Sequence, residues 1–150
     1  MNSLELNEAD TALIRSLIEA DVEFAVIGGH AVSAHGFSRP VSDLDILIAP
    51  NRENASRIKS AIASVGIPIA VDFESRISQP RANFILPDPF YGQLLGSISG
   101  VETSLALQDL AFAPLGVLRV PVISLSILIA TKRALGRPQD IADLHGLAGV

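Results

Sequence analysis

The chain of 150 residues is long enough for one compact domain, 1–150, and a hydrophobic share of 49% excludes an intrinsically disordered protein. The absence of cysteine excludes disulfides and thiolate metal sites, and a net charge of -5 argues against broad, sequence-independent binding of nucleic acid. We expect a cytoplasmic protein without a membrane partner, because the N-terminus is acidic and no apolar run could cross a bilayer.

The first fifty residues alternate helical and extended patterns. Apolar spacing and breaking residues predict a helix, a strand, a short helix and a second strand, in that order: 8–20, 24–27, 31–35 and 44–49. Asn7 is a typical N-cap for the first helix, and Pro50 stops the second strand. This alternation is typical of a layered α/β fold.

The remainder of the chain predicts further helices and strands of the same fold. Asn51 caps a helix with an apolar stripe through Ile58 and Ile62. Two strands that form a hairpin, a later strand and a helix are then predicted at 81–86, 91–98, 117–122 and 124–136. Pro138 opens a last helix toward Leu147.

Two short motifs hold the residues best suited to chemistry. Gly28 and Gly29 follow the first predicted strand, where backbone N–H groups can approach phosphate oxygens closely because no Cβ intervenes. Asp43 and Asp45 stand two residues apart at the second strand, so their carboxylates face the same side and can share a divalent cation. The motifs form one site if these strands are neighbours.

Each motif alone is more often a solvated turn than a site, and only their combination on consecutive strands favours a site for metal and nucleotide. A dinucleotide-binding fold is a poor alternative, because the segment after the first strand lacks the third glycine of Gly-x-Gly-x-x-Gly. We expect His30 and His35, on the short helix beside the glycines, to pack or support the site rather than transfer protons.

The run from Val26 to Gly36, with Arg39 and Asp43-Leu44-Asp45-Ile46, resembles the signature of the nucleotidyltransferase superfamily. It is most similar to small bacterial members related to the toxin component of the AbiE abortive-infection systems. A second stretch, Lys132 to Asp140 with Asp143, is similar to the Lys-Arg-x-x-Gly-Arg-Pro-x-Asp-x-x-Asp segment of that group. The two stretches cover roughly the first and last thirds of the chain, and the middle third matches only loosely.

The resemblance implies an α/β (α+β) fold, with a mixed sheet flanked by helices, and metal-dependent transfer of a nucleoside monophosphate from an NTP to a hydroxyl acceptor. It assigns catalysis and the binding of Mg²⁺ or Mn²⁺ to Asp43 and Asp45. The residues implied in nucleotide binding are Gly28, Gly29, Arg39, Lys132 and Arg137. For Lys132 and Arg137 a solvated helix end is an equal alternative. We expect Asp140 and Asp143 to cap or pair within the last helix rather than to bind metal.

Gln93 departs from the pattern of the superfamily. Members usually supply a third carboxylate from a later strand, and the stretch 92–100 resembles the one in which an acid occupies the position of Gln93. An amide oxygen can bind a cation, but it adds no charge and cannot act as a base, so metal affinity and acceptor activation should weaken. Asp72 or Asp88 could replace the acid, although neither is in register, and Val41 stands where relatives commonly have threonine.

Two classes of function follow from these observations. The first is an enzyme that transfers nucleotides to RNA, protein or a small hydroxyl compound, as part of a toxin–antitoxin or phage-defence pair with a cognate antitoxin protein. The second is a catalytically degenerate module that binds a nucleotide or a partner through the same fold.

Overall fold

The computed structural model describes residues 1–149. The chain forms one mixed sheet whose strand order is β3-β4-β2-β1-β6-β5. The strands are β1 (Phe24–Ile27), β2 (Leu44–Ile48), β3 (Asn83–Ile85), β4 (Gly92–Leu95), β5 (Leu110–Leu115) and β6 (Leu118–Ile123). The helices are α1 (Glu8–Glu19), α2 (Gly28–Ala34), α3 (Arg52–Ser64), α4 (Phe73–Ile77), α5 (Thr103–Gln108), α6 (Leu125–Leu135) and α7 (Pro138–Ala148).

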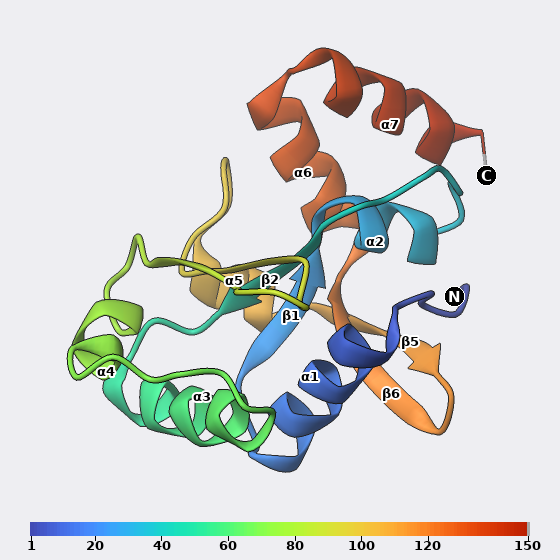
Figure 1. The fold of residues 1–150 in the computed structure, drawn as a ribbon. Helices are drawn as coiled ribbons and strands as arrows, with labels where there is room; N and C mark the ends of the chain where they lie inside the picture. Colours follow the sequence, from blue (N-terminus) through green and yellow to red (C-terminus); the bar gives the residue numbers. More distant parts are fainter. Residues whose placement is uncertain (150) are drawn as a thin grey trace.

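The central strands are buried on both faces by the flanking helices. All four residues of β1 are buried, and β2 is buried except at Asp45. Figure 1 shows α1 and α3 side by side at one end of the molecule and α6 and α7 stacked at the other, with α2 beneath them. The helices α1 and α3 contribute the apolar stripes that their sequences predict, including Leu13, Leu17, Ile58 and Ile62, which are fully buried. The sheet and helices therefore share one hydrophobic core.

The predicted fold class and most predicted elements are confirmed. The side chains of Asn7, Asn51 and Ser124 cap α1, α3 and α6, and β3 and β4 form the predicted antiparallel hairpin. The short helix after β1 begins at Gly28 rather than at residue 31, so the glycine pair forms its first turn instead of a separate turn before it. The short helices α4 and α5 and the strand β5 were not among the predicted elements.

The pairing of β2 with β4 depends on Gly92. The two strands run parallel, with Leu44 opposite Gly92 and Asp45 opposite Gln93. Gly92 has φ 143°, and a Cβ there would lie 1.7 Å from the carbonyl oxygen of Leu44. Since this neighbour is backbone rather than a flexible side chain, only glycine allows the approach. Gly92 therefore fixes the register that places Gln93 beside Asp45.

We predict that Gly92→Ala lowers the free energy of unfolding by about 3 kcal/mol or more, because β4 must move away from β2. The matched control is Gly116→Ala: Gly116 also has a positive φ, 59°, but a Cβ there meets nothing within 4 Å. That control should cost only about 1 kcal/mol of backbone strain. Urea unfolding of the two variants provides the measurement, and equal losses would contradict the role given to Gly92.

Candidate functional site

The candidate site lies beside the strand ends, where β1 ends and where β2 and β4 begin. Ile27, the last residue of β1, is paired with Asp45 of β2, and Asp45 is paired in turn with Gln93 of β4. Because β1 and β2 are antiparallel neighbours, Gly28 follows Ile27 directly beside Asp45. The backbone thus brings the glycine motif, the acidic motif and Gln93 together, as the sequence predicted for neighbouring strands.

Gly28 and Gly29 have different surroundings. Gly28 has φ 66°, and a Cβ there would lie 3.0 Å from Oδ2 of Asp45, so both conformation and space favour glycine. A Cβ on Gly29 would lie 2.9 Å from Cγ1 of Val41 and 3.3 Å from Nη1 of Arg39. Gly28 therefore faces the acidic motif, whereas Gly29 faces the segment that leads into β2.

The two aspartates differ in exposure. Asp43 is exposed just before β2, and Asp45 is half-buried within it. Burial raises the pKa of Asp45, and the negative charge of Asp43 raises it further. The amide of Gln93 and the positive charges of Lys132 and Arg137 act in the opposite direction without cancelling the increase. The ionised carboxylate of Asp45 thus lacks part of the stabilisation that a bound cation would supply.

A cavity of about 590 Å³ opens beside Asp45. Its lining comes from β1, β2, β4, α6 and the start of α2, and from the turn before β3, the 97–99 segment and the residue before α7: Ile27, Gly28, Asp45, Arg81, Gln93, Leu95, Ser97, Ile98, Ser99, Thr131, Lys132, Leu135 and Arg137. Five of the predicted site residues therefore share one cavity, which we call the site cavity. Asp43, Gly29 and Arg39 do not line it. Arg81, Thr131 and the serines were not predicted, because only the fold brings them to the glycine and acidic motifs.

A second, smaller cavity of about 360 Å³ shares Asp45 and Gln93 with the site cavity. Asp43 and Asp88 also line it, together with the aromatic residues Phe90 and Tyr91. Asp72, the other acid considered as a replacement for the missing carboxylate, lines neither cavity. Asp45 and Gln93 therefore stand between two openings, one with cationic residues in its lining and one with further acids.

Lys132 is the centre of a buried ionic cluster. Its side chain is only 6% exposed, and Nζ lies 3.1 Å from Oδ1 of Asp140 and 3.0 Å from Oδ2 of Asp143. The interpretation of Lys132 as a solvated helix end is therefore wrong. Arg137, with a side chain that is 64% exposed, donates to Asp140 through Nε at 2.7 Å. Asp140 accepts from the backbone N–H of Arg137 as well, which caps α7 as expected.

The pairing of Asp143 extends beyond its own helix. Arg39 donates to both carboxylate oxygens of Asp143, through Nε at 2.7 Å and Nη2 at 2.9 Å. This bidentate pair ties the segment before β2 to α7 and leaves Arg39 outside the site cavity. The expectation that Asp143 pairs only within the last helix is thus too narrow, because Arg39 of the segment before β2 reaches α7.

The two histidines beside the glycines contribute to packing. His30 is buried, and burial together with the charge of Arg39 lowers the pKa of His30, so its imidazole is neutral at physiological pH. Nε2 of His35 lies 2.8 Å from the carbonyl oxygen of Ile123 and links α2 to the end of β6. Both arrangements agree with the supporting role expected from the sequence.

No protein-family model and no curated protein matches the sequence. Solved structures nevertheless resemble the fold, and two of them are compared with it below. One is TM1012 from Thermotoga maritima, described as a candidate nucleotidyltransferase, with a TM-score of 0.58 and 18% identity over 93% of this chain and 89% of that one. The other is the lincosamide antibiotic adenylyltransferase LnuA in its lincomycin-bound form, with a TM-score of 0.63 and 12% identity over 97% of this chain and 98% of that one. The chain has the nucleotidyltransferase fold.

Within this nucleotidyltransferase fold, the oxygen ligands available for a cation are limited. Among residues 1–149, no three acidic or histidine side chains gather closely enough to hold one ion. Asp43, Asp45 and the amide of Gln93 nevertheless form a set of hard oxygen donors, and Mg²⁺ is usually held by one or two carboxylates completed by water and substrate phosphates. The donor set therefore fits a divalent cation that binds together with a nucleotide.

The cluster around Lys132 yields a prediction for stability against pH. Hydrogen bonds from Arg137 and Lys132 lower the pKa of Asp140 from 3.8 to about 2. Because the pKa is lower in the folded state, the ionised carboxylate stabilises the fold above about pH 4, and this stabilisation is lost as the pH falls toward 2. We predict that Asp140→Asn costs roughly 2 kcal/mol at neutral pH and that the difference from wild type shrinks over this range.

Urea unfolding at a series of pH values measures this difference. Glu53→Gln is the control, because it removes an exposed pair with Arg57 on α3 and should cost less than about 0.5 kcal/mol. A loss in Asp140→Asn that does not vary between pH 4 and 2 would show that the ionised carboxylate is not the stabilising group.

Proposed function

We propose that the protein is a divalent-metal-dependent nucleotidyltransferase that moves a nucleoside monophosphate from an NTP to a hydroxyl acceptor. The observation that carries the proposal is the site cavity, where Gly28, Asp45 and Gln93 meet Lys132 and Arg137. Oxygen ligands for a cation thus lie next to positive charge for phosphates. Both similar structures have this fold, and both are described as enzymes that transfer nucleotides.

Each residue has a distinct role in this proposal. Asp43 and Asp45 would hold Mg²⁺ or Mn²⁺, with Gln93 as an additional oxygen ligand, and the metal would supply polarisation of the α-phosphate and positive charge for the leaving pyrophosphate. Gly28 lets the triphosphate approach the backbone closely. The positive charges of Lys132 and Arg137 face the phosphates from α6 and the start of α7.

The remaining two predicted nucleotide-binding residues lie outside the site cavity. Gly29 lies beside Val41 and the side chain of Arg39, and neither Gly29 nor Arg39 lines the site cavity. We assign to them the positioning of the segment that carries Asp43, because Gly29 leaves the space that Val41 fills and Arg39 forms the bidentate bond to Asp143. In the transfer itself, the acceptor oxygen bonds to the α-phosphorus, the bond from that phosphorus to pyrophosphate breaks, and the proton of the acceptor hydroxyl passes to solvent.

The smaller cavity is our candidate for the acceptor, because it shares Asp45 and Gln93 with the site cavity and would approach the cation from another direction. The acceptor is RNA, a protein or a small hydroxyl compound, and the description of LnuA as an antibiotic adenylyltransferase supports the last of these.

The AbiE-like motifs support a role in a toxin–antitoxin or phage-defence pair, with a cognate antitoxin as partner. A cytoplasmic location suits these roles, and no helix in residues 1–149 could span a membrane.

Gln93 supports a second candidate function, in which the chain binds a nucleotide or a partner without catalysing transfer. The position beside Asp45 holds an amide, and Asp88 reaches only the smaller cavity. Without a carboxylate at position 93 the site has less negative charge to attract a metal, and the amide of Gln93 cannot itself serve as a base for the acceptor hydroxyl. Incubation with acceptor candidates and each labelled NTP separates the two functions.

We predict that Asp45→Asn lowers the rate of metal-dependent transfer by at least about 100-fold. Substitution of residues that only hydrogen-bond to metal ligands already lowers metal affinity or activity by about 10- to 100-fold. The same variant should be more stable than wild type without metal at neutral pH. The reason is that the raised pKa of Asp45 makes its ionised form a cost to the folded state.

Thermal unfolding with and without Mg²⁺ and NTP tests the metal site independently of any acceptor. Wild type should be stabilised by the pair of ligands, and Asp45→Asn should not. Asp72→Asn is the control, since Asp72 lines neither cavity. Equal stabilisation of Asp45→Asn and wild type would exclude Asp45 as a metal ligand.

A fourth prediction concerns the missing acid. Gln93→Glu places a third carboxylate beside Asp45, so the protein without metal should become less stable while Mg²⁺ with NTP binds about tenfold more tightly. Asn83→Asp adds the same charge on β3, outside both cavities, and should change neither property. Calorimetric titration and thermal unfolding measure the two effects, and a Gln93→Glu variant that behaves like the control would place position 93 outside the site.

A further inference from the structure

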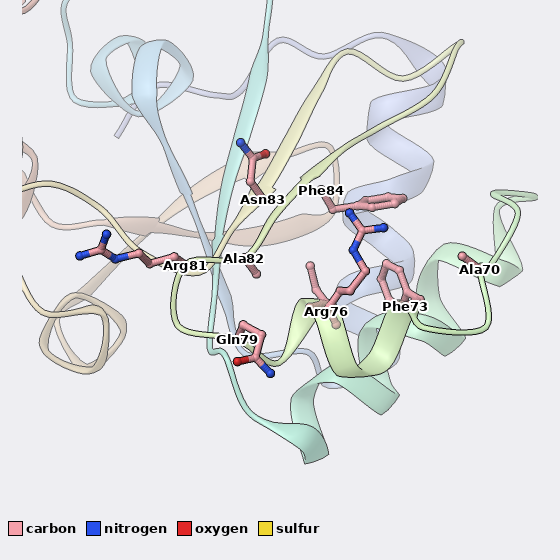
Figure 2. Close-up of a pocket in the computed structure, with 9 residues that line it drawn as sticks. Ala70, Phe73, Arg76, Gln79, Arg81, Ala82, Asn83 and Phe84 are labelled. Carbon is pink, nitrogen blue, oxygen red and sulfur yellow. The ribbon is translucent and has the colours of Figure 1, made fainter.

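Arg81 is a third cation in the site cavity, and no motif in the sequence points to it. It lies in the turn between α4 and β3 and lines the cavity together with Gln93 and Ser97. It also borders a neighbouring cavity of about 370 Å³ between α4 and β3. Figure 2 shows the side chain of Arg81 directed away from Phe73, Arg76 and Phe84, which line that neighbouring cavity. The guanidinium therefore extends toward the side of the turn on which the site cavity lies.

The backbone of the turn that carries Arg81 is fixed against the end of β4. The N–H of Gly96 donates to the carbonyl oxygen of Ala82 at 2.9 Å, and the N–H of Ala82 donates to that of Gln79 at 3.0 Å. A Cβ on Gly96 would lie 2.9 Å from the carbonyl oxygen of Gln79 and 3.0 Å from that of Pro80. The close packing of Gly96 against this turn fixes the position of the Arg81 backbone beside the site.

The three cations of the site cavity differ in what already neutralises them. Lys132 is held between Asp140 and Asp143, and Arg137 is bonded to Asp140. The exposed Arg81 has no carboxylate within ion-pair distance in residues 1–149. Much of the charge of Lys132 and Arg137 is therefore used within the protein, whereas all the donors of Arg81 are available to a ligand.

We propose that Arg81 binds the phosphate tail of the nucleotide through its guanidinium. The inference rests on the proposed function, because it takes the ligand of the site cavity to be an NTP. A guanidinium presents two parallel N–H donors that match two oxygens of a phosphate, and it keeps its charge at any physiological pH. Arg81 supplies the uncompensated positive charge that the cavity needs for a polyanionic ligand.

The test compares the affinities of NTP and NMP in calorimetric titrations without an acceptor, so that transfer plays no part. Arg81→Gln should weaken NTP binding about ten- to hundredfold, because the guanidinium no longer binds the β- and γ-phosphates. It should weaken NMP binding much less, because an NMP lacks these two phosphates. Arg81→Lys keeps the charge but not the paired donors and should lie between Arg81→Gln and wild type. The dependence of NTP affinity on salt should also become shallower in Arg81→Gln.

Arg76→Gln is the matched control. Arg76 lies on α4, has no carboxylate partner in residues 1–149 and lines the neighbouring cavity but not the site cavity. Its substitution should leave the NTP and NMP affinities unchanged. Since Arg81 is exposed, the thermal unfolding of Arg81→Gln without ligand should match that of wild type.

Three outcomes would overturn the inference, and they can be told apart. If wild type binds NTP and Arg81→Gln binds it equally well, Arg81 does not contact the phosphates, while the proposed function stands. If wild type binds no NTP in the presence of Mg²⁺, the proposed function fails and the role of Arg81 fails with it. Equal weakening by Arg81→Gln and Arg76→Gln would also overturn the inference, because it would show only a general effect of surface charge.

Discussion

The buried ammonium of Lys132 depends on two carboxylates, and much of the site depends on that arrangement. A charge removed from water must be paired, so Asp140 and Asp143 of α7 have to lie against α6. Asp143 also accepts both bonds from Arg39, which fixes the chain just before Asp43. The ionic cluster thus joins the last helix to the acidic motif, although the two are far apart in sequence.

The sheet brings the other half of the site into place by register. The antiparallel pairing of β1 with β2 puts Gly28 next to Asp45, and the parallel pairing of β2 with β4 puts Gln93 on the other side. Neither arrangement requires a long or flexible loop, because all three residues stand at or next to strand ends. Strand pairing therefore holds these three residues in place, which suits a reaction that relies on positioning and electrostatics.

The sequence predicted most of the elements but missed α4, α5 and β5. Helices such as α3 carry a side-chain cap and an apolar stripe, which are local signals. The helix α4 spans only five residues, too few to show a helical period. Strand β5 contains Pro114 and several half-buried or exposed residues, which its position at the edge of the sheet allows. Such elements exist because of their neighbours in the fold.

The sequence by itself determined the fold class, the glycine and acidic motifs and the amide at position 93, because these are properties of residue type and spacing. Only the tertiary structure decided how the cations are used. The sequence does not show that Lys132 and Arg39 are both bonded to buried aspartates, or that Arg81, which belongs to no motif, lines the site cavity without an ion-pair partner in residues 1–149. The physical reason is that pairing between charges depends on distances across the fold, which spacing along the chain does not specify.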